Sequence, residues 1–253
     1  MSDFKFNEFV DILRRLRKEC PWDREQTNDS IKMATIEEAY EALDAINNKD
    51  YKELKEELGD LLLHVVFHSV IAEEDGHFNL DEVIDGISKK LIRRHPHVFG
   101  DVTVEDTAEV MKNWEAIKLG EGKSSVLSGV PISMPALHRA FRMQEKAAKT
   151  GFEWQSLDQV KEKIIEERGE LEEAEESGDF AKLEEEFGDY LFALTNYARF
   201  KKINPENALN LASKKFEQRF GFIESELAKE NRNPSEASLE EMLELWNKSK
   251  SGG

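Results

Sequence analysis

One segment of this chain occurs twice, and the repeat constrains the fold more than any other feature of the sequence. The stretch "IEEAYEALDAINNKDYKELKEELGD" (36–60) matches "IEERGELEEAEESGDFAKLEEEFGD" (165–189) without a gap, at a constant offset of 129 residues. A tryptophan precedes each copy, within "CPWD" and "GFEW". Self-similarity of this kind is the signature of a duplicated structural unit. The sequence therefore predicts two copies of one domain in tandem.

The spacing of apolar residues predicts that both copies are helical. Ile36, Tyr40, Leu43 and Ile46 follow one another at steps of three or four residues. This period places them on one face of an α-helix. Alternating strand patterns and Asn-Gly hairpin turns are absent from the sequence. We expect an all-α fold in which each repeat is built around an antiparallel helical hairpin.

The composition between the repeats predicts where the domains end. The stretch "LGEGKSSVLSGVPISMP" (119–135) is rich in Gly, Ser and Pro, which is typical of a linker. We expect an N-terminal domain at 1–118 and a C-terminal domain at 136–253. Each has the size of a small helical domain.

Charge and cysteine content narrow the classes of partner and compartment. The formal net charge is -18, which argues against binding to nucleic acid, because phosphate contacts need clustered Lys and Arg. The same charge suits metal cations. Cys20 is the only cysteine, so an internal disulfide is excluded and a reducing, cytoplasmic setting is expected. The most apolar run, "LLLHVVFHSVIA", is too short to span a bilayer, so we expect no membrane segment.

The acidic residues of the repeat are arranged symmetrically about the turn of the expected hairpin. Residues equidistant from the turn of an antiparallel helix pair lie at similar heights, so Glu38 is expected near Asp60, and Glu41 near Glu57. Gly59 is expected to let the two helices approach closely. Four carboxylates in one place repel one another and need a counter-charge, and oxygen ligands suit Mg²⁺ or Mn²⁺ better than zinc. The alternative is a solvated acidic face, the usual role of Glu-rich helices.

Several motifs together resemble one enzyme family. "EEAYE" followed by "ELGD", together with "CPWDREQT" and "RRHPHVFGD", resembles the MazG family of all-α nucleoside triphosphate pyrophosphohydrolases. The resemblance covers nearly the whole chain. It implies hydrolysis of nucleoside triphosphates to monophosphates and pyrophosphate with Mg²⁺, and assembly as a homodimer. The metal ligands that it implies are Glu38, Glu41, Glu57 and Asp60 in the first copy and Glu167, Glu170, Glu186 and Asp189 in the second.

The first Glu of each motif, Glu37 or Glu166, is a candidate base for the attacking water. The alternative is that it contacts the metal ligands without binding the metal itself. Arg93 and Arg94 stand in a basic segment, and their guanidinium forks suit phosphate. The alternative for this pair is a cationic helix end that complements the helix macrodipole. Further candidate substrate contacts, four of which rest on the resemblance, are Lys118, Lys182, Lys215, Arg219 and Trp246.

Three other residues have two possible roles. His64 follows Asp60 by one helical turn, and we interpret it as a hydrogen-bonded core residue in preference to a site residue. Trp22 and Trp154 either stack on a base or pack in a core.

The second copy departs from the first at Gly169, where glycine inside a helix costs about 1 kcal/mol relative to alanine.

The favoured mechanism is attack of a metal-activated water on the α-phosphorus, with pyrophosphate as the leaving group. One rival is a non-catalytic acidic helical scaffold that binds partner proteins. Another is a phosphohydrolase that releases orthophosphate. A P-loop NTPase is disfavoured because the G-x-x-x-x-G-K-[ST] motif is absent. Base preference and the division of labour between the copies stay open.

Overall fold

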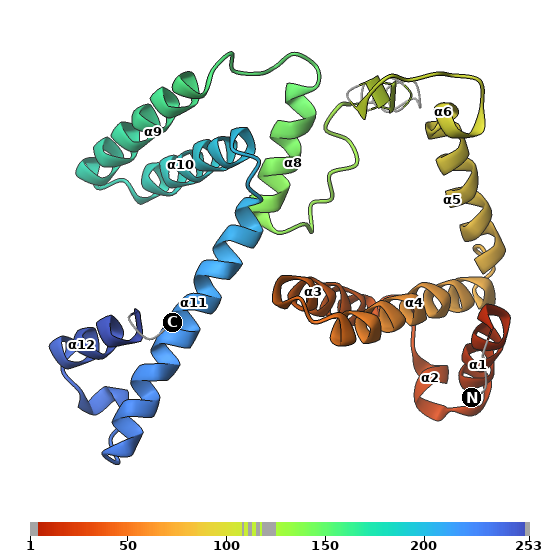
Figure 1. Cartoon of the computed structure of the whole chain (residues 1–253), viewed down its shortest axis with the longest axis horizontal. Helices are drawn as coiled ribbons and strands as arrows, with labels where there is room; N and C mark the ends of the chain where they lie inside the picture. The colour runs from red at the N-terminus through yellow and green to blue at the C-terminus, as the bar shows by residue number, and fades with distance from the viewer. Residues whose placement is uncertain (1–4, 108, 111–112, 115–116, 118–124, 251–253) are drawn as a thin grey trace. The chain divides into compact units, whose positions relative to one another are not determined.

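The structure is a computed structural model of the chain, and its elements divide into two units. Met1–Glu121 forms unit 1 and Gly122–Gly253 forms unit 2, and each unit holds one copy of the repeat (Figure 1). Every regular element of the described residues is helical, which confirms the all-α tandem prediction. The expected domain limits stay predictions. The described residues are 5–107, 109–110, 113–114, 117 and 125–250.

Unit 1 is arranged around the long helix α4. The helix α3 pairs with α4 as the predicted hairpin, while α1 and α5 also pack against α4. None of the described helices combines the length and hydrophobicity that a bilayer crossing requires. The helices of this unit are α1 (Phe6–Glu19), α2 (Pro21–Glu25), α3 (Lys32–Asn48), α4 (Tyr51–Glu74), α5 (Leu80–Arg94) and α6 (Pro96–Phe99).

Unit 2 repeats the hairpin and adds helices at its C-terminal end. The helix α9 pairs with α10, α8 packs against α10, and α12 packs against α11. The helices are α8 (Ala136–Ala148), α9 (Leu157–Ser177), α10 (Phe180–Phe200), α11 (Pro205–Lys229) and α12 (Leu239–Lys250), with a 3₁₀ turn, η1 (Pro234–Glu236), before α12.

The turns of the two hairpins are built in the same way. The first helix of each pair ends on a left-handed residue, Lys49 (φ 58°) in unit 1 and Gly178 (φ 70°) in unit 2. The next residue, Asp50 or Asp179, caps the second helix by accepting hydrogen bonds from two backbone N–H groups of its first turn. The shared offset of the sequence repeat is therefore also a shared backbone turn.

Small residues let the helices of each hairpin pack. Ala45 of α3 and its counterpart Ala174 of α9 are completely buried. By contrast, a Cβ added at Gly59 or Gly188 would meet no atom within 4 Å. The expectation that Gly59 allows close approach is wrong, because the described structure leaves open space beside it.

The apolar core of unit 1 joins α1, α4 and α5. Val10 and Leu13 of α1 pack with Val66 and Val70 of α4 and with Leu80 of α5. This burial is the main source of stability for an amphipathic helix in a small domain.

Arg17 holds the segment that leads into α3. Its guanidinium is buried, donates to Glu74 of α4 at 2.5 Å and lies over the Phe67 ring at 5.7 Å. It also donates to the backbone carbonyls of Asp23 and Gln26. The four contacts tie α1, α2 and α4 together, and so fix the chain just before α3.

Both hairpins leave an apolar stripe exposed. Exposed side chains of α4 recur at helical spacing, and the same repeat positions are exposed on α10. Exposed apolar side chains that share one helical face are candidates for an interaction surface. The stripe residues are Leu58, Leu62 and Val65 on α4 and Phe187, Leu191 and Leu194 on α10.

Candidate functional site

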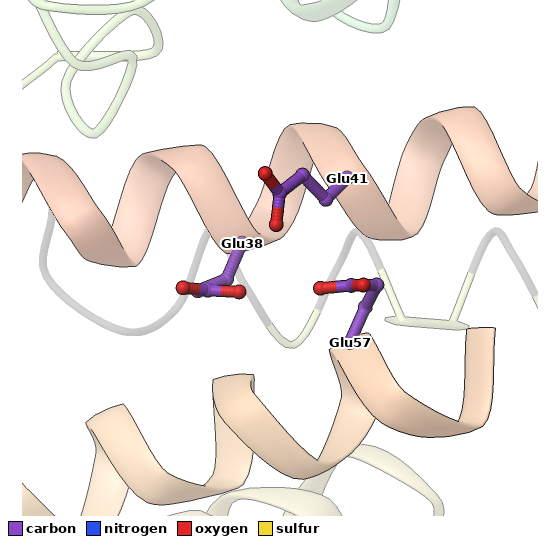
Figure 2. Close-up of side chains that lie close together, drawn as sticks. All are labelled: Glu38, Glu41 and Glu57. Carbon is purple, nitrogen blue, oxygen red and sulfur yellow. The ribbon is translucent and has the colours of Figure 1, made fainter. Parts of the chain in front are cut away.

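Three of the predicted acidic ligands of the first repeat converge between α3 and α4. Glu38 and Glu41 come from α3 and Glu57 from α4, and each offers a carboxylate oxygen within 4.8 Å of the other two (Figure 2). Asp60, the fourth predicted ligand, is exposed and is not part of this group in the described structure. Glu37 is also exposed. The structure thus brings together three of four side chains.

Glu57 of the unit 1 cluster holds a proton more tightly than an isolated carboxyl does. The pKa of Glu57 is raised from 4.5 to about 7, first by burial, then by the charge of Glu41 and by hydrogen bonds with Glu38 and Glu41. Neighbouring negative charges make it harder for a carboxyl group to lose its proton, unless a cation lies nearby. This cluster therefore has the electrostatics of a cation site.

The second repeat forms an equivalent cluster with a different membership. Oxygens of Glu167 from α9 and of Glu186 and Asp189 from α10 lie within 4.8 Å of one another. Glu170 is not part of this group in the described structure, but its charge acts on Glu186. The pKa of Glu186 is raised by burial and then by Glu170, while Lys182 lowers it.

Lys163 is a functional candidate that the sequence interpretation missed. Its Nζ lies 2.6 Å from Oε1 of Glu167 and 2.7 Å from Oε1 of Glu166. These hydrogen bonds raise the pKa of Lys163 above its usual range. The only signal in the sequence was the i, i+3 and i, i+4 spacing to the two acids, which is also typical of solvated helix faces.

One oxygen of Glu167 is buried and lacks a partner. Glu167 is only 6% exposed, and its Oε2 has no hydrogen-bond partner among the described residues. A buried ionised oxygen without a partner is costly, and cation coordination removes that cost. The donor set is made of carboxylates, as hard divalent cations prefer. The residues present therefore fit a divalent cation.

A pocket of about 530 Å³ adjoins this cluster within unit 2. Glu167 and Asp189 belong to its lining, together with Lys163. Much of the remaining wall is apolar or aromatic, including Phe152 and Trp154. An apolar pocket with a few polar groups at one side is the usual form of a small-molecule site.

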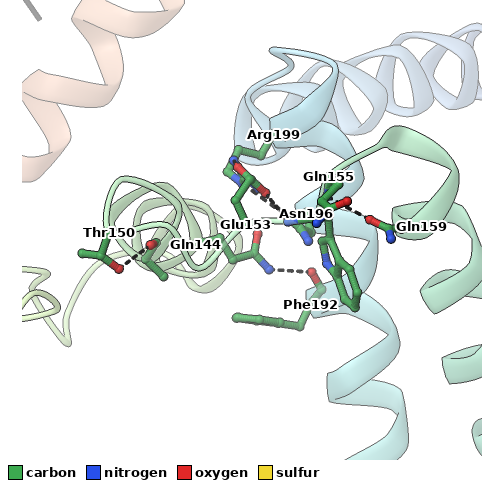
Figure 3. Close-up of polar contacts among 10 residues, drawn as sticks. Gln144, Thr150, Glu153, Gln155, Gln159, Phe192, Asn196 and Arg199 are labelled. Atoms are coloured by element: carbon green, nitrogen blue, oxygen red, sulfur yellow. Dashed lines mark hydrogen bonds and ion pairs between the residues drawn. The ribbon is translucent and has the colours of Figure 1, made fainter. Parts of the chain in front are cut away.

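A hydrogen-bonded network forms another wall of the pocket. Arg199 donates to both carboxylate oxygens of Glu153 at 2.6 and 2.5 Å, and to Oδ1 of Asn196 at 2.8 Å (Figure 3). Gln144 donates from Nε2 to the Phe192 carbonyl at 2.8 Å (Figure 3). These bonds fix the polar side chains of the wall before any ligand enters.

The predicted substrate contacts of α11 and α12 form a separate group. Arg219 lies over the ring of Trp246, 5.5 Å from its centroid, and Phe216 packs against the same ring at 5.3 Å. Lys215 is exposed one turn before Arg219. None of these residues lines the pocket in the described part of unit 2. The structure leaves their predicted contact with nucleotide untested.

Other predicted residues of unit 1 lie on helices outside the α3–α4 hairpin. Arg93 and Arg94 occupy the last turn of α5, where positive charge complements the helix macrodipole. Arg94 also lies over the Trp114 ring, 5.6 Å from its centroid. Trp22 is 64% exposed on α2, in contrast to Trp154, which lines the pocket. Lys118 lies outside the described residues.

The family of the chain follows from a match that occurs twice. The family model of the MazG nucleotide pyrophosphohydrolase domain matches residues 26–99 and again residues 155–220. The chain belongs to the MazG family. Each match contains one acidic cluster, and the second also contains Lys163. The tandem architecture is therefore a pair of MazG domains.

Two named relatives match this chain almost from end to end. The nucleoside triphosphate pyrophosphohydrolase/pyrophosphatase MazG of Thermotoga maritima is 45% identical over 98% of this chain and 96% of its own length. The nucleoside triphosphate pyrophosphohydrolase of Escherichia coli K12 is 43% identical over 96% of this chain and 95% of its own length. The protein YabN of Bacillus subtilis is 47% identical over 97% of this chain, which spans 52% of YabN.

One solved structure overlaps part of the chain. A mazG-related protein from Thermotoga maritima aligns with 45% of this chain and 98% of its own, at 25% identity and a TM-score of 0.41. The MazG assignment rests on the family match and the full-length relatives.

Proposed function

We propose that this MazG protein hydrolyses nucleoside triphosphates to the monophosphate and pyrophosphate, and that unit 2 supplies a catalytic centre. Relatives from Thermotoga maritima and Escherichia coli that match almost end to end are named for this activity. The observation that carries the proposal is the unpartnered, buried Oε2 of Glu167 beside a pocket of nucleotide-compatible size.

The metal is Mg²⁺, with Mn²⁺ as a substitute, because its ligands are carboxylates. Glu167, Glu186 and Asp189 would hold it in unit 2, with Glu170 as the fourth predicted ligand. When bound, such a cation neutralises the triphosphate and lowers the pKa of a water molecule. In unit 1 the corresponding ligands would be Glu38, Glu41 and Glu57, with Asp60 as the fourth predicted ligand.

The side chains of unit 2 divide the remaining work. The aromatic wall of the pocket, with Trp154, accommodates the base. Lys163 and Lys182 place ammonium groups beside the cluster and bind phosphate oxygens. Glu166 takes a proton from the attacking water as the water oxygen bonds to the α-phosphorus. The bond from the α-phosphorus to the α,β-bridging oxygen breaks, and pyrophosphate leaves with that oxygen.

We further propose that two copies of the chain form a homodimer. Equivalent apolar stripes on α4 and α10 are exposed, and a small hairpin domain buries little surface by itself. Association of two chains removes this surface from water.

Product analysis tests the proposed reaction. ATP, dATP and other nucleoside triphosphates are incubated with the protein and Mg²⁺, and pyrophosphate is separated from orthophosphate. We expect a monophosphate and pyrophosphate, and no turnover in excess EDTA. A diphosphate with orthophosphate as the main product would assign the protein to the rival class of hydrolase, and absence of turnover would favour the scaffold hypothesis.

A further inference from the structure

A continuous line of polar side chains leads to the acidic cluster of unit 1. Asn28 Oδ1 lies 2.6 Å from Nδ1 of His68, and Nε2 of His68 lies 2.9 Å from the hydroxyl of Thr35. The same hydroxyl lies 3.2 Å from Nδ1 of His64. The other ring nitrogen of His64, Nε2, lies 3.9 Å from Oε1 of Glu38. The line ends at a residue of the proposed metal site.

The order of donors and acceptors along this line determines how the His64 ring is held. Burial and the neighbouring His64 lower the pKa of His68, so its ring is neutral and carries one proton. The side-chain amide of Asn28 and the hydroxyl of Thr35 hold the His68 ring at its two nitrogens. The same hydroxyl can donate its one proton to Nδ1 of His64, and a neutral His64 ring then carries its own proton on Nε2. This leaves Nε2 of His64 facing Glu38.

The common scaffold of the two units does not require this line. At the repeat offset, Thr35 corresponds to Ile164, and His64 corresponds to Ala193. Unit 2 holds the equivalent acid, Glu167, with Lys163 instead, and the position of Lys163 is Ala34 in unit 1. Each unit thus supports the same acid with an unrelated side chain.

We propose that His64 is a positioning residue for Glu38, turned toward it by the contacts with Thr35, His68 and Asn28. The inference rests on the proposed metal site of unit 1. His64 is 7% exposed and held at Nδ1, so its Nε2 occupies a defined place beside the cluster. The 3.9 Å separation exceeds a hydrogen bond, and a small rotation of the half-buried Glu38 closes it when the acid turns to a cation.

Hydrogen bonds to ligating carboxylates orient them, and their loss typically weakens metal binding about 10- to 100-fold. His64 acts on Glu38 alone in this proposal and does not bind the nucleotide. Its removal is therefore expected to change the affinity of unit 1 for a divalent cation and to leave that of unit 2 unchanged.

The test is calorimetric titration of Mn²⁺ into the full chain carrying Glu186→Gln, which weakens the site of unit 2. Two further substitutions of His64 are compared in this parent. Asn places a polar atom near the position of Nδ1, so it keeps the contact with Thr35 and loses the one with Glu38. Gln places a polar atom near the position of Nε2, so it keeps the contact with Glu38. We expect His64→Asn to raise the Kd for Mn²⁺ about 10- to 100-fold and His64→Gln to stay close to the parent.

The proposal is overturned if His64→Asn binds as tightly as the parent, or if both variants weaken binding equally. Glu41→Gln in the same parent separates this failure from failure of the metal site. If Glu41→Gln leaves Mn²⁺ binding unchanged, unit 1 holds no cation and the site itself is wrong. If the His64 variants do not fold, Thr35→Val and Thr35→Ser decide: only the valine variant is expected to lose affinity, and equal binding by the two contradicts the proposal.

Discussion

Lys163 and Glu167 form an ion pair at 2.6 Å on one face of α9, and the other oxygen of Glu167 has no partner in the described structure. The pair is asymmetric, because Glu167 is buried and Lys163 is about one-third exposed. The lysine ammonium pairs with Oε1 of Glu167, and Oε2 stays available to bind a cation.

Lys163→Met is expected to destabilise the protein in EDTA by about 1–2 kcal/mol, because the buried Glu167 loses its counter-charge while solvent screens part of the effect. Saturating Mg²⁺ should restore part of the loss by supplying another positive charge. Urea unfolding with EDTA and with Mg²⁺ measures both effects. Lys161→Met is the matched control, since Lys161 pairs with exposed Asp158 on the same helix. An equal loss in both variants would contradict the role of Lys163.

Stability in EDTA should fall as the pH rises from about 4.5 to about 7. Glu57 has a pKa of about 7 in the folded protein and an ordinary value of 4.5, so the folded state binds more protons in this window. Stability is therefore greatest where Glu57 is protonated. Urea midpoints across this range should decline less steeply for Glu57→Gln, whereas Glu56→Gln, outside the cluster, should follow the wild type. Parallel slopes for the wild type and Glu57→Gln would refute the expectation.

Glu170→Gln should lower turnover at least about 10-fold, because it removes a charge that acts on Glu186 in the cluster beside the pocket. Glu41→Gln should also reduce turnover by disrupting the cluster of unit 1. Steady-state release of pyrophosphate gives the measurement, and circular dichroism verifies the fold. Glu176→Gln, an exposed acid near the end of α9, is the control. A folded double mutant of Glu41 and Glu170 with wild-type turnover would show that neither hairpin is catalytic.

Gly169→Ala should raise the free energy of unfolding by about 0.5–1 kcal/mol. Gly169 lies inside α9, and an added Cβ meets no atom within 4 Å. Gly178→Ala is the reciprocal control, because its φ of 70° disfavours any side chain, and it should lower stability by about 1 kcal/mol. Denaturant titration of both variants decides the matter. A loss of stability for Gly169→Ala would mean that the site has no room for the methyl group.

Sedimentation should give particles of about twice the chain mass of 29.1 kDa at micromolar concentration. Phe187→Glu places a charge on the exposed stripe of α10 and should shift the distribution toward single chains without loss of helicity. Glu176→Gln again serves as the control. Wild-type protein that sediments only as single chains would refute the homodimer.

The repeat predicted the hairpins well, since the turn, the left-handed residue and the Asp cap all depend on local sequence. The sequence predicted the membership of the acidic clusters only in part. Equal height along two helices does not determine the direction of a side chain, and Asp60 is exposed to solvent. Trp22 and Trp154 occupy equivalent motifs, yet Trp22 is 64% exposed whereas Trp154 lines a pocket, and this difference depends on how α8 and α10 pack around Trp154. Lys163 could not be distinguished by spacing alone from lysines such as Lys161 that pair with solvated acids.

The contact between Arg17 and Glu74 has a consequence for the order in which unit 1 folds on the ribosome. The two residues are 57 positions apart, so α1 is synthesised long before its carboxylate partner emerges. Until then the guanidinium has only the nearby carbonyls of Asp23 and Gln26 as partners, and the apolar face of α1 lacks the α4 residues that it packs against. The α3–α4 hairpin, whose contacts are closer in sequence, can form first, because loop closure costs less over a shorter separation. The N-terminal helix of the nascent chain therefore docks only after α4 has been synthesised. Truncation before Glu74 would leave Arg17 without its carboxylate partner.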